Sequence, residues 1–150
     1  MKAKISIIGL ILVLTTTATS QEIDTSLTME GANPPNILMS GNGTLSRLVI
    51  RGHKTLRKIP GPDSSAVWYI KMIDYDHGQL VSRLSPISYG KLPTGYVQKY
   101  PEQGEAPQLE ENVIYYIQVD TWNANGASGY FLIKDGKINF AKYESELKKH

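Results

Sequence analysis

Two acids and a histidine, Asp74, Asp76 and His77, form the group in this chain that most resembles a metal site. On an extended chain Asp74 and Asp76 would point to the same side and could share a hard cation. A twelve-residue calcium loop does not fit, because Ser85 stands at its closing glutamate position and Gly78 at an oxygen-ligand position. Aspartate and glycine are also typical of tight turns, so we expect a hydrated hairpin turn and no metal.

Residues suited to nucleophilic catalysis occur without a recognisable pattern. No serine lies in a Gly-x-Ser-x-Gly elbow, and residues 126–129 miss that motif by one position. The three histidines are scattered without a zinc-binding spacing. Glu110 and Glu111 are adjacent, so on a strand they would face opposite sides and could not form a glycosidase pair. We expect no enzyme activity and no cofactor, and keep a hydrolase that uses His53 or His77 as a third hypothesis.

Residues 1–20 are typical of a secretory signal peptide. Lys2 and Lys4 precede an apolar run that is too short to span a bilayer, and small residues follow it. We therefore expect cleavage before Gln21 and no membrane insertion of the mature chain. The sequence contains no cysteine, which excludes disulfides and a thiol-linked lipid anchor. These features predict a periplasmic or secreted protein with one domain, residues 21–150.

Charge is balanced in the expected mature chain but uneven along it. Two of the sixteen basic residues lie in the leader, so fourteen remain against fourteen acidic residues, and we expect no nucleic-acid partner. Basic residues gather in 47–58 and acidic residues in 102–111. We interpret these stretches as two solvated surfaces, with a docking patch for an anionic partner as the alternative.

Alternating apolar segments bounded by turn residues predict an all-β fold. Trp68, Ile70 and Met72 should share one face of a central strand, whereas the proline-rich stretch 86–107 should run mostly over the surface. A short helix is expected in the last ten residues. Six or seven strands with little helix indicate a two-sheet sandwich or a small barrel. The candidate segments for these six or seven strands are residues 23–29, 37–39, 45–50, 67–73, 95–99, 113–121, 129–133 and 138–140.

One segment, 109–128, resembles strand F of a fibronectin type III domain. That family places a leucine six residues before a tyrosine, then alternating apolar residues, then an asparagine and a glycine; here these are Leu109, Tyr115, Ile117, Val119, Asn123 and Gly126. The resemblance implies a tyrosine corner, in which the Tyr115 hydroxyl bonds upstream backbone, and makes Trp68 a candidate to pack against it. It implies an immunoglobulin-like two-sheet sandwich, a class of domain that mostly binds, stiffens or spaces. With the helix expected from the last ten residues, the predicted fold is a single immunoglobulin-like two-sheet sandwich with a short C-terminal helix.

Aromatic residues are dominated by tyrosine, with nine tyrosines and two tryptophans against two phenylalanines. We assign Trp68 and Tyr115 to the core. Three tyrosines lie among prolines and glycines, where burial of all three is not expected, and Trp122 should be partly exposed in a turn. The candidate partner-binding residues are Tyr89, Tyr96, Tyr100, Glu102, Glu105 and Trp122.

Our main hypothesis is an exported, non-catalytic protein-binding domain, such as a periplasmic immunity or inhibitor protein against a toxin or hydrolase. The alternative is a carbohydrate-binding or structural module of the cell surface, with Tyr96, Tyr100 or Trp122 stacked on sugar rings and Asn123 and Asn125 bonding hydroxyls. A flat aromatic platform would favour sugar. A protruding acidic or tyrosine loop would favour protein.

Overall fold

The computed structural model describes residues 24–52, 61 and 64–147, and within them the predicted all-β class is confirmed. The expected signal peptide and the basic residues 53–58 lie outside the described residues. The strands are β1 (Ser26–Glu30), β2 (Asn36–Ser40), β3 (Thr44–Arg51), β4 (Ala66–Met72), β5 (Ile87–Ser88), β6 (Tyr96–Tyr100), β7 (Ile114–Trp122), β8 (Ala127–Lys134) and β9 (Lys137–Ala141). The helical segments are η1 (Tyr75–His77), α1 (Val81–Leu84) and α2 (Glu144–Leu147), of which α2 is the expected C-terminal helix.

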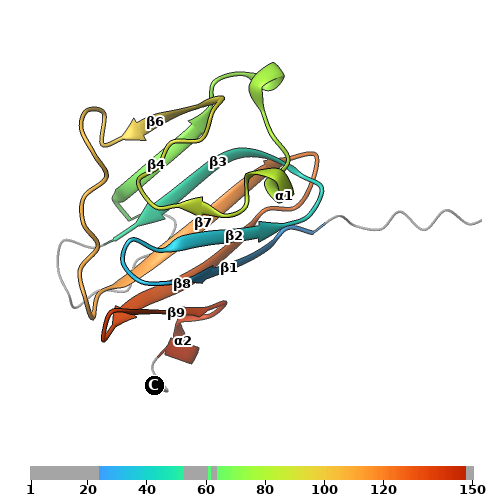
Figure 1. Ribbon diagram of the computed structural model, residues 1–150. Coiled ribbons are helices and arrows are strands. Elements are labelled where there is room, and N and C mark those ends of the chain that lie inside the picture. The colour runs from blue at the N-terminus through green and yellow to red at the C-terminus, as the bar shows by residue number, and fades with distance from the viewer. Residues whose placement is uncertain (1–23, 53–60, 62–63, 148–150) are drawn as a thin grey trace, which may run out of the picture.

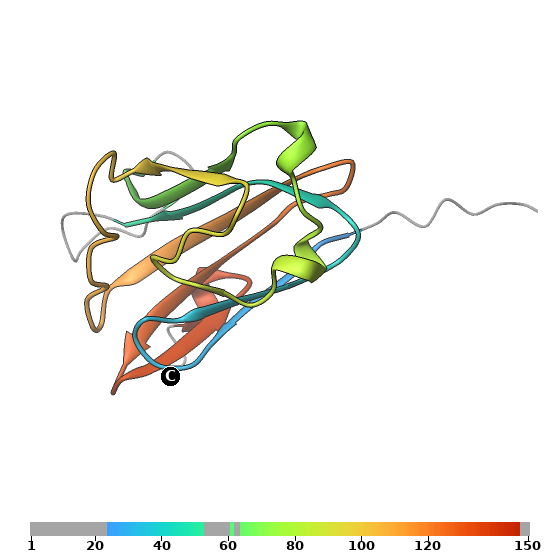
Figure 2. The same cartoon turned by 45° about the horizontal axis from the view of Figure 1, so that its top comes forward.

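Two antiparallel sheets face each other as a sandwich, as Figure 1 shows with β1 and β2 in front of β7 and β8. The smaller sheet has the order β1-β2-β5, and the larger has the order β6-β4-β3-β7-β8-β9. The tight connection predicted between the second and third strands is present, but it carries the chain from one sheet to the other instead of pairing β2 with β3. Figure 2, turned by 45°, shows the same two layers.

The hydrophobic core lies between the sheets and follows the predicted alternation. Trp68, Ile70 and Met72 are buried, while Lys71 between them is exposed. The Trp68 indole N–H is satisfied by Gln98 Oε1 at 3.0 Å, so burial leaves no unpaired donor there. Full burial of one large aliphatic or aromatic side chain stabilises the fold by about 1.5–3 kcal/mol. The largest fully buried side chains include Trp68, Phe131, Ile37, Leu45, Leu48 and Ile50.

The predicted contact of Tyr115 with upstream backbone is confirmed. The backbone N–H of Glu110 donates to Tyr115 Oη at 2.9 Å, and the Tyr115 ring stacks on Phe131 with centroids 5.3 Å apart. The ring contact of Trp68 is instead with Tyr89, at 5.2 Å between centroids. The tyrosine therefore pins the entry of β7, whereas the tryptophan packs under the β5–β6 segment.

Three short elements were not predicted: η1, α1 and β5. β5 has two residues directly after Pro86, too few to show a strand period, and α1 is a single turn without a side-chain cap. The edge strand expected at 95–99 is present as β6, followed by Pro101. No helix among the described residues is long and apolar enough to cross a membrane.

The sandwich has two ends that differ in their loops. The connections 41–43, 73–80 and 123–126 meet at one end, because Thr44 is opposite both Trp122 and Leu80. The long segment 101–113 lies at the other end, on the left in Figure 1. Loops far apart in the sequence are thus brought together at the first end.

Candidate functional site

Two exposed aromatic rings meet at the end where the connections 41–43, 73–80 and 123–126 come together. Tyr75 is 67% exposed and Trp122 is 55% exposed, yet their ring centroids lie only 4.9 Å apart at 59°. Ile73, which precedes η1, is a third exposed large apolar side chain in these loops. We call Ile73, Tyr75 and Trp122 the aromatic end. Exposed aromatic and aliphatic side chains that gather in this way are typical of interaction surfaces.

Tyr75 is held by a capped and tightly packed turn. The Asp74 carboxylate accepts from the His77 backbone N–H at 3.0 Å, and Gly78 N–H closes the turn onto the Tyr75 carbonyl at 3.4 Å. The turn also lies against its neighbours so closely that a Cβ on Gly78 would come within 2.7 Å of Met72 Sδ. The ring therefore projects from a support with little freedom to move.

Trp122 is the last residue of β7 and is fixed by the turn that follows. Asn123 has the left-handed φ of 61°, which asparagine tolerates better than most residues, and its Oδ1 accepts from Thr44 N–H at 3.4 Å. Thr121 Oγ1 donates to the Ala124 carbonyl at 2.7 Å. The Thr44 bond ties the turn to β3 and the Thr121 bond closes the turn itself, so Trp122 stays beside Tyr75.

Tyr96 links the aromatic end to the core. Its hydroxyl donates to the Leu45 carbonyl at 2.8 Å and accepts from Gln79 N–H at 3.2 Å, while Leu45 N–H donates directly to the Gln79 carbonyl at 3.0 Å. The phenol thus fills a gap between two backbone segments, next to the irregular register of β3 and β7 after Leu45. Gln79 lies two residues past η1, so this bridge anchors the loop that carries Tyr75.

Polar groups lie beside Trp122 on β7, because Gln118 and Asp120 precede it at period two and share its face of the strand. On β3 and β7, Arg47 Nε bonds the Asp120 carboxylate, and Gln118 Nε2 also donates to that carboxylate at 3.0 Å. An apolar centre with a polar rim is the usual anatomy of a protein interface.

The predicted metal-like group is a turn-stabilising contact in the structure. Residues 75–77 form a 3-10 turn, not the extended chain or hairpin that was expected. The Asp74 carboxylate faces its own turn, where His77 Nδ1 contacts it at 2.5 Å. This hydrogen bond raises the pKa of His77 and lowers that of Asp74. Within the described residues, no group of three potential ligands is close enough to hold a metal.

The structure separates the six predicted partner-binding residues. Trp122 lies at the aromatic end, whereas Tyr100, Glu102 and Glu105 are exposed at the opposite end of the sandwich. Tyr89 and Tyr96 are only 6% and 3% exposed.

Both buried tyrosines use their hydroxyls inside the domain. Tyr89 Oη donates to the Pro107 carbonyl at 2.7 Å, and burial strongly raises the pKa of this phenol. These two rings support the fold and do not offer a surface to a partner.

Sequence reasoning did not select Ile73 and Tyr75. Ile73 was assigned to the end of the preceding apolar strand and Tyr75 to the turn that follows it. In that turn only Asp74, Asp76 and His77 were considered as functional residues. A usable signal was present: with Trp68, Ile70 and Met72 facing inward, period two places Ile73 outward.

The site therefore consists of two exposed rings in contact at one end of the sandwich, with polar side chains beside Trp122 on β7. Among the described residues, the only histidine of this site is His77, which bonds the Asp74 carboxylate on an exposed turn.

No family model, curated protein or solved structure matches the chain.

Proposed function

We propose that the chain is an exported, non-catalytic domain that binds another protein through the aromatic end, acting as an immunity or inhibitor protein of the periplasm. The observation that carries this proposal is the contact between Tyr75 and Trp122, two rings that are both more than half exposed. Tryptophan and tyrosine are the residues most enriched among binding hot spots, and their stiff rings lose little entropy on binding. Rings already held together lose still less.

An immunoglobulin-like assignment of the sandwich supports the same site. If β2 and β3 correspond to strands B and C, and β7 and β8 to F and G, the aromatic end contains the B–C and F–G loops. These are the loops that antibody variable domains use for recognition. The Glu110 N–H bond to Tyr115 Oη supports the assignment, because a tyrosine near the start of strand F makes such a contact in that class.

Protein is favoured over carbohydrate by the geometry of the rings. A sugar platform needs a flat ring face, but Tyr75 and Trp122 are tilted by 59° and share no plane. The tyrosines that would complete a platform are elsewhere, with Tyr96 in the core and Tyr100 at the opposite end. The η1 loop instead protrudes from the sandwich at the upper right of Figure 1.

Affinity capture with ring variants tests the proposal. The mature protein from Gln21, its Trp122→Ala and Tyr75→Ala variants, and Tyr100→Ala as a matched control with an exposed ring would each be immobilised. Envelope and secreted proteins of the host would then be applied at moderate salt. We expect one stoichiometric protein to be retained by the wild type and by Tyr100→Ala and lost from the other two. Retention by all four proteins, or of glycan alone, would contradict the proposal.

A further inference from the structure

The outer face of the larger sheet, which is turned away from the core, carries an excess of positive charge. Because Ile70 and Met72 lie in the core, period two turns Lys71 outward, and Arg47 is its direct partner on β3. The whole sequence has a net charge of only +2 over 150 residues, so the excess is local. We call the outward side chains of β6, β4, β3 and β7 the basic face. Its charged residues are the cations Arg47, Arg51, Lys71 and Lys99 and the anion Asp120.

Two cations of the basic face lie directly opposite each other on neighbouring strands. Arg47 and Lys71 are partners in the register of β3 and β4, which places their Cβ atoms about 4.5–5.5 Å apart. Like charges in this position destabilise a sheet. Arg47 has an acid on its other side, because Asp120 is its partner on β7. Lys71 is exposed and has no acidic partner among the residues that the structure describes. The stability of the fold therefore does not require this pair of cations.

The single acid of the basic face is already engaged by its own neighbours. Gln118 Nε2 donates to the two oxygens of the Asp120 carboxylate at 3.0 and 3.3 Å, and Arg47 Nε bonds the same carboxylate. The Arg47 side chain nevertheless remains 46% exposed. A guanidinium has further N–H donors beyond Nε, arranged as a fork that matches a carboxylate. Arg47 can therefore bind a second carboxylate, with Lys71 beside it, without losing Asp120.

The basic face continues into the aromatic end. Ile73 follows Lys71 by two residues, and its N–H still bonds the Gly95 carbonyl at 3.0 Å, so it shares the outward side of the strand. Trp122 follows Asp120 by two residues on β7 in the same way. A stable interface buries about 800 Å² on each partner, from about 20–30 residues, which is far more than three side chains can supply. A protein that covers the aromatic end must therefore also cover surface next to it.

The turn on the other side of the rings has the opposite charge. Asp74 and Asp76 of the η1 loop are exposed, and Asp74 is bonded to His77. Acidic groups of a partner would be repelled by this turn and attracted by the basic face. The distribution of charge around the aromatic end thus favours one orientation of an acidic partner, with its acids over β3 and β4.

We propose that the partner protein docks an acidic surface on the basic face, with one carboxylate between Arg47 and Lys71 and apolar side chains on the aromatic end. This proposal rests on the proposed function, because it names the chemistry of the partner at the same site. Complementary charge of this kind speeds association and selects the partner more than it adds affinity. Association should therefore become slower as the salt concentration rises.

Hexaglutamate with blocked ends serves as the probe, and hexaglutamine with blocked ends is its neutral control. Binding is followed at low salt by the backbone amide signals and the arginine Nε–H signals of the ¹⁵N-labelled mature protein. We expect hexaglutamate to cause saturable shifts of the Lys71 amide and of Arg47 Nε–H. Hexaglutamine should leave both signals in place, and high salt should weaken the binding of hexaglutamate.

A charge reversal at Lys71 tests the pair of cations. Lys71→Glu should lower the affinity for hexaglutamate about tenfold or more, because an attractive charge becomes a repulsive one. The new acid would lie opposite Arg47, an arrangement that stabilises a sheet, so we expect this variant to fold. Near-UV circular dichroism and urea unfolding check that it does.

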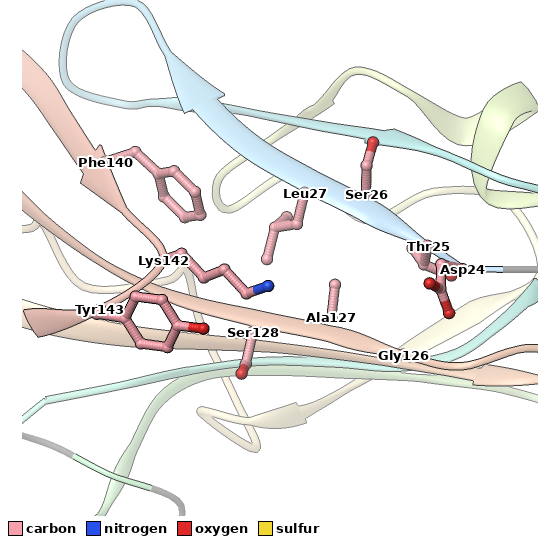
Figure 3. A pocket seen from close by; sticks show the side chains of 10 residues that line it. All are labelled: Asp24, Thr25, Ser26, Leu27, Gly126, Ala127, Ser128, Phe140, Lys142 and Tyr143. Atoms are coloured by element: carbon pink, nitrogen blue, oxygen red, sulfur yellow. The ribbon is translucent and has the colours of Figure 1, made fainter.

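Lys142→Glu is the matched control, because it makes the same change in net charge at an exposed lysine outside the basic face. In Figure 3 the Lys142 side chain reaches across a pocket of about 520 Å³ between β1 and β8, which also contains the carboxylate of Asp24. We expect Lys142→Glu to bind hexaglutamate within about twofold of the wild type, since salt screens charges that are not in contact.

Unchanged Lys71 and Arg47 signals in the presence of hexaglutamate would overturn the proposal. A folded Lys71→Glu variant that binds hexaglutamate as well as Lys142→Glu does would also overturn it. A heparin hexasaccharide that binds this face more tightly than hexaglutamate would show that the occupant is a sulfated glycan and not an acidic protein.

The captured partner separates this proposal from the proposed function. If Trp122→Ala loses the partner while Lys71→Glu associates as fast as Lys142→Glu, the aromatic end stands and the acidic partner is wrong. If Lys71→Glu slows association while Trp122→Ala binds normally, the basic face stands and the aromatic end is wrong.

Discussion

Replacement of Tyr96 by phenylalanine should destabilise the domain by an amount set by its single hydroxyl. The ring of this buried residue stays, so the packing of the core is kept. The Leu45 carbonyl loses its donor at 2.8 Å, and the Gln79 N–H loses its acceptor at 3.2 Å. A buried polar group left without a partner costs about 1–3 kcal/mol. Because the Gln79 contact is the longer one, we expect a total of about 2–3 kcal/mol.

Urea unfolding of Tyr96→Phe, followed by circular dichroism, measures this loss. Tyr100→Phe is the matched control, since this exposed ring at the end of β6 should change the free energy of unfolding by less than about 0.5 kcal/mol. A Tyr96→Phe variant as stable as the control would refute the bridging role of the hydroxyl. The direct bond from Leu45 N–H to the Gln79 carbonyl would then be the contact that anchors the η1 loop to β3.

Three further predictions concern particular contacts. Gly129→Ala should lower the free energy of unfolding by about 1–3 kcal/mol in urea, because the added Cβ would overlap Phe140, while Ser128→Ala should leave it unchanged within about 0.5 kcal/mol. Tyr115→Phe should cost about 1 kcal/mol in the same assay, since only the part-buried Glu110 N–H loses its partner. In an NMR titration the pKa of His77 should lie above its ordinary value of 6.5 and return toward it in Asp74→Asn. The charged pair therefore stabilises the η1 turn below the ordinary pKa of His77 as long as Asp74 is ionised, and this stabilisation is lost as pH rises through the raised pKa of His77. An unchanged His77 titration in the variant would contradict the contact.

The layers of the fold could be predicted from sequence because most strands are long enough to show alternation. Ile117 and Val119 alternate with polar neighbours, and both are fully buried. β5 could not be found in this way, because two residues have no period and the preceding proline suggests a loop. The pairing order of the strands was not predicted either. A tight turn between β2 and β3 favours a hairpin, but residues 41–43 carry the chain from one sheet to the other.

The candidate site was predicted only in part. Trp122 was selected as an exposed residue of a turn; it is instead the last residue of β7, but its exposure agrees with the selection. Tyr96 was selected for its proline and glycine neighbours, but Leu45, 51 residues away, supplies the carbonyl that draws its hydroxyl inward. The composition of the neighbouring residues gives no information about a hydrogen-bond partner so distant in sequence. Tyr75 was not selected as a binding residue for the same reason, because its contact with Trp122 exists only in the folded chain.

Hydrogen exchange of the complex between the mature protein and its captured partner locates the surface that the partner covers. Binding through the aromatic end should protect backbone amides in 73–78 and 122–126, the segments that carry Tyr75 and Trp122. Amides in 101–109, at the opposite end of the sandwich, should exchange as they do in the free protein. Protection of 101–109 with no change at 73–78 and 122–126 would contradict binding through the aromatic end.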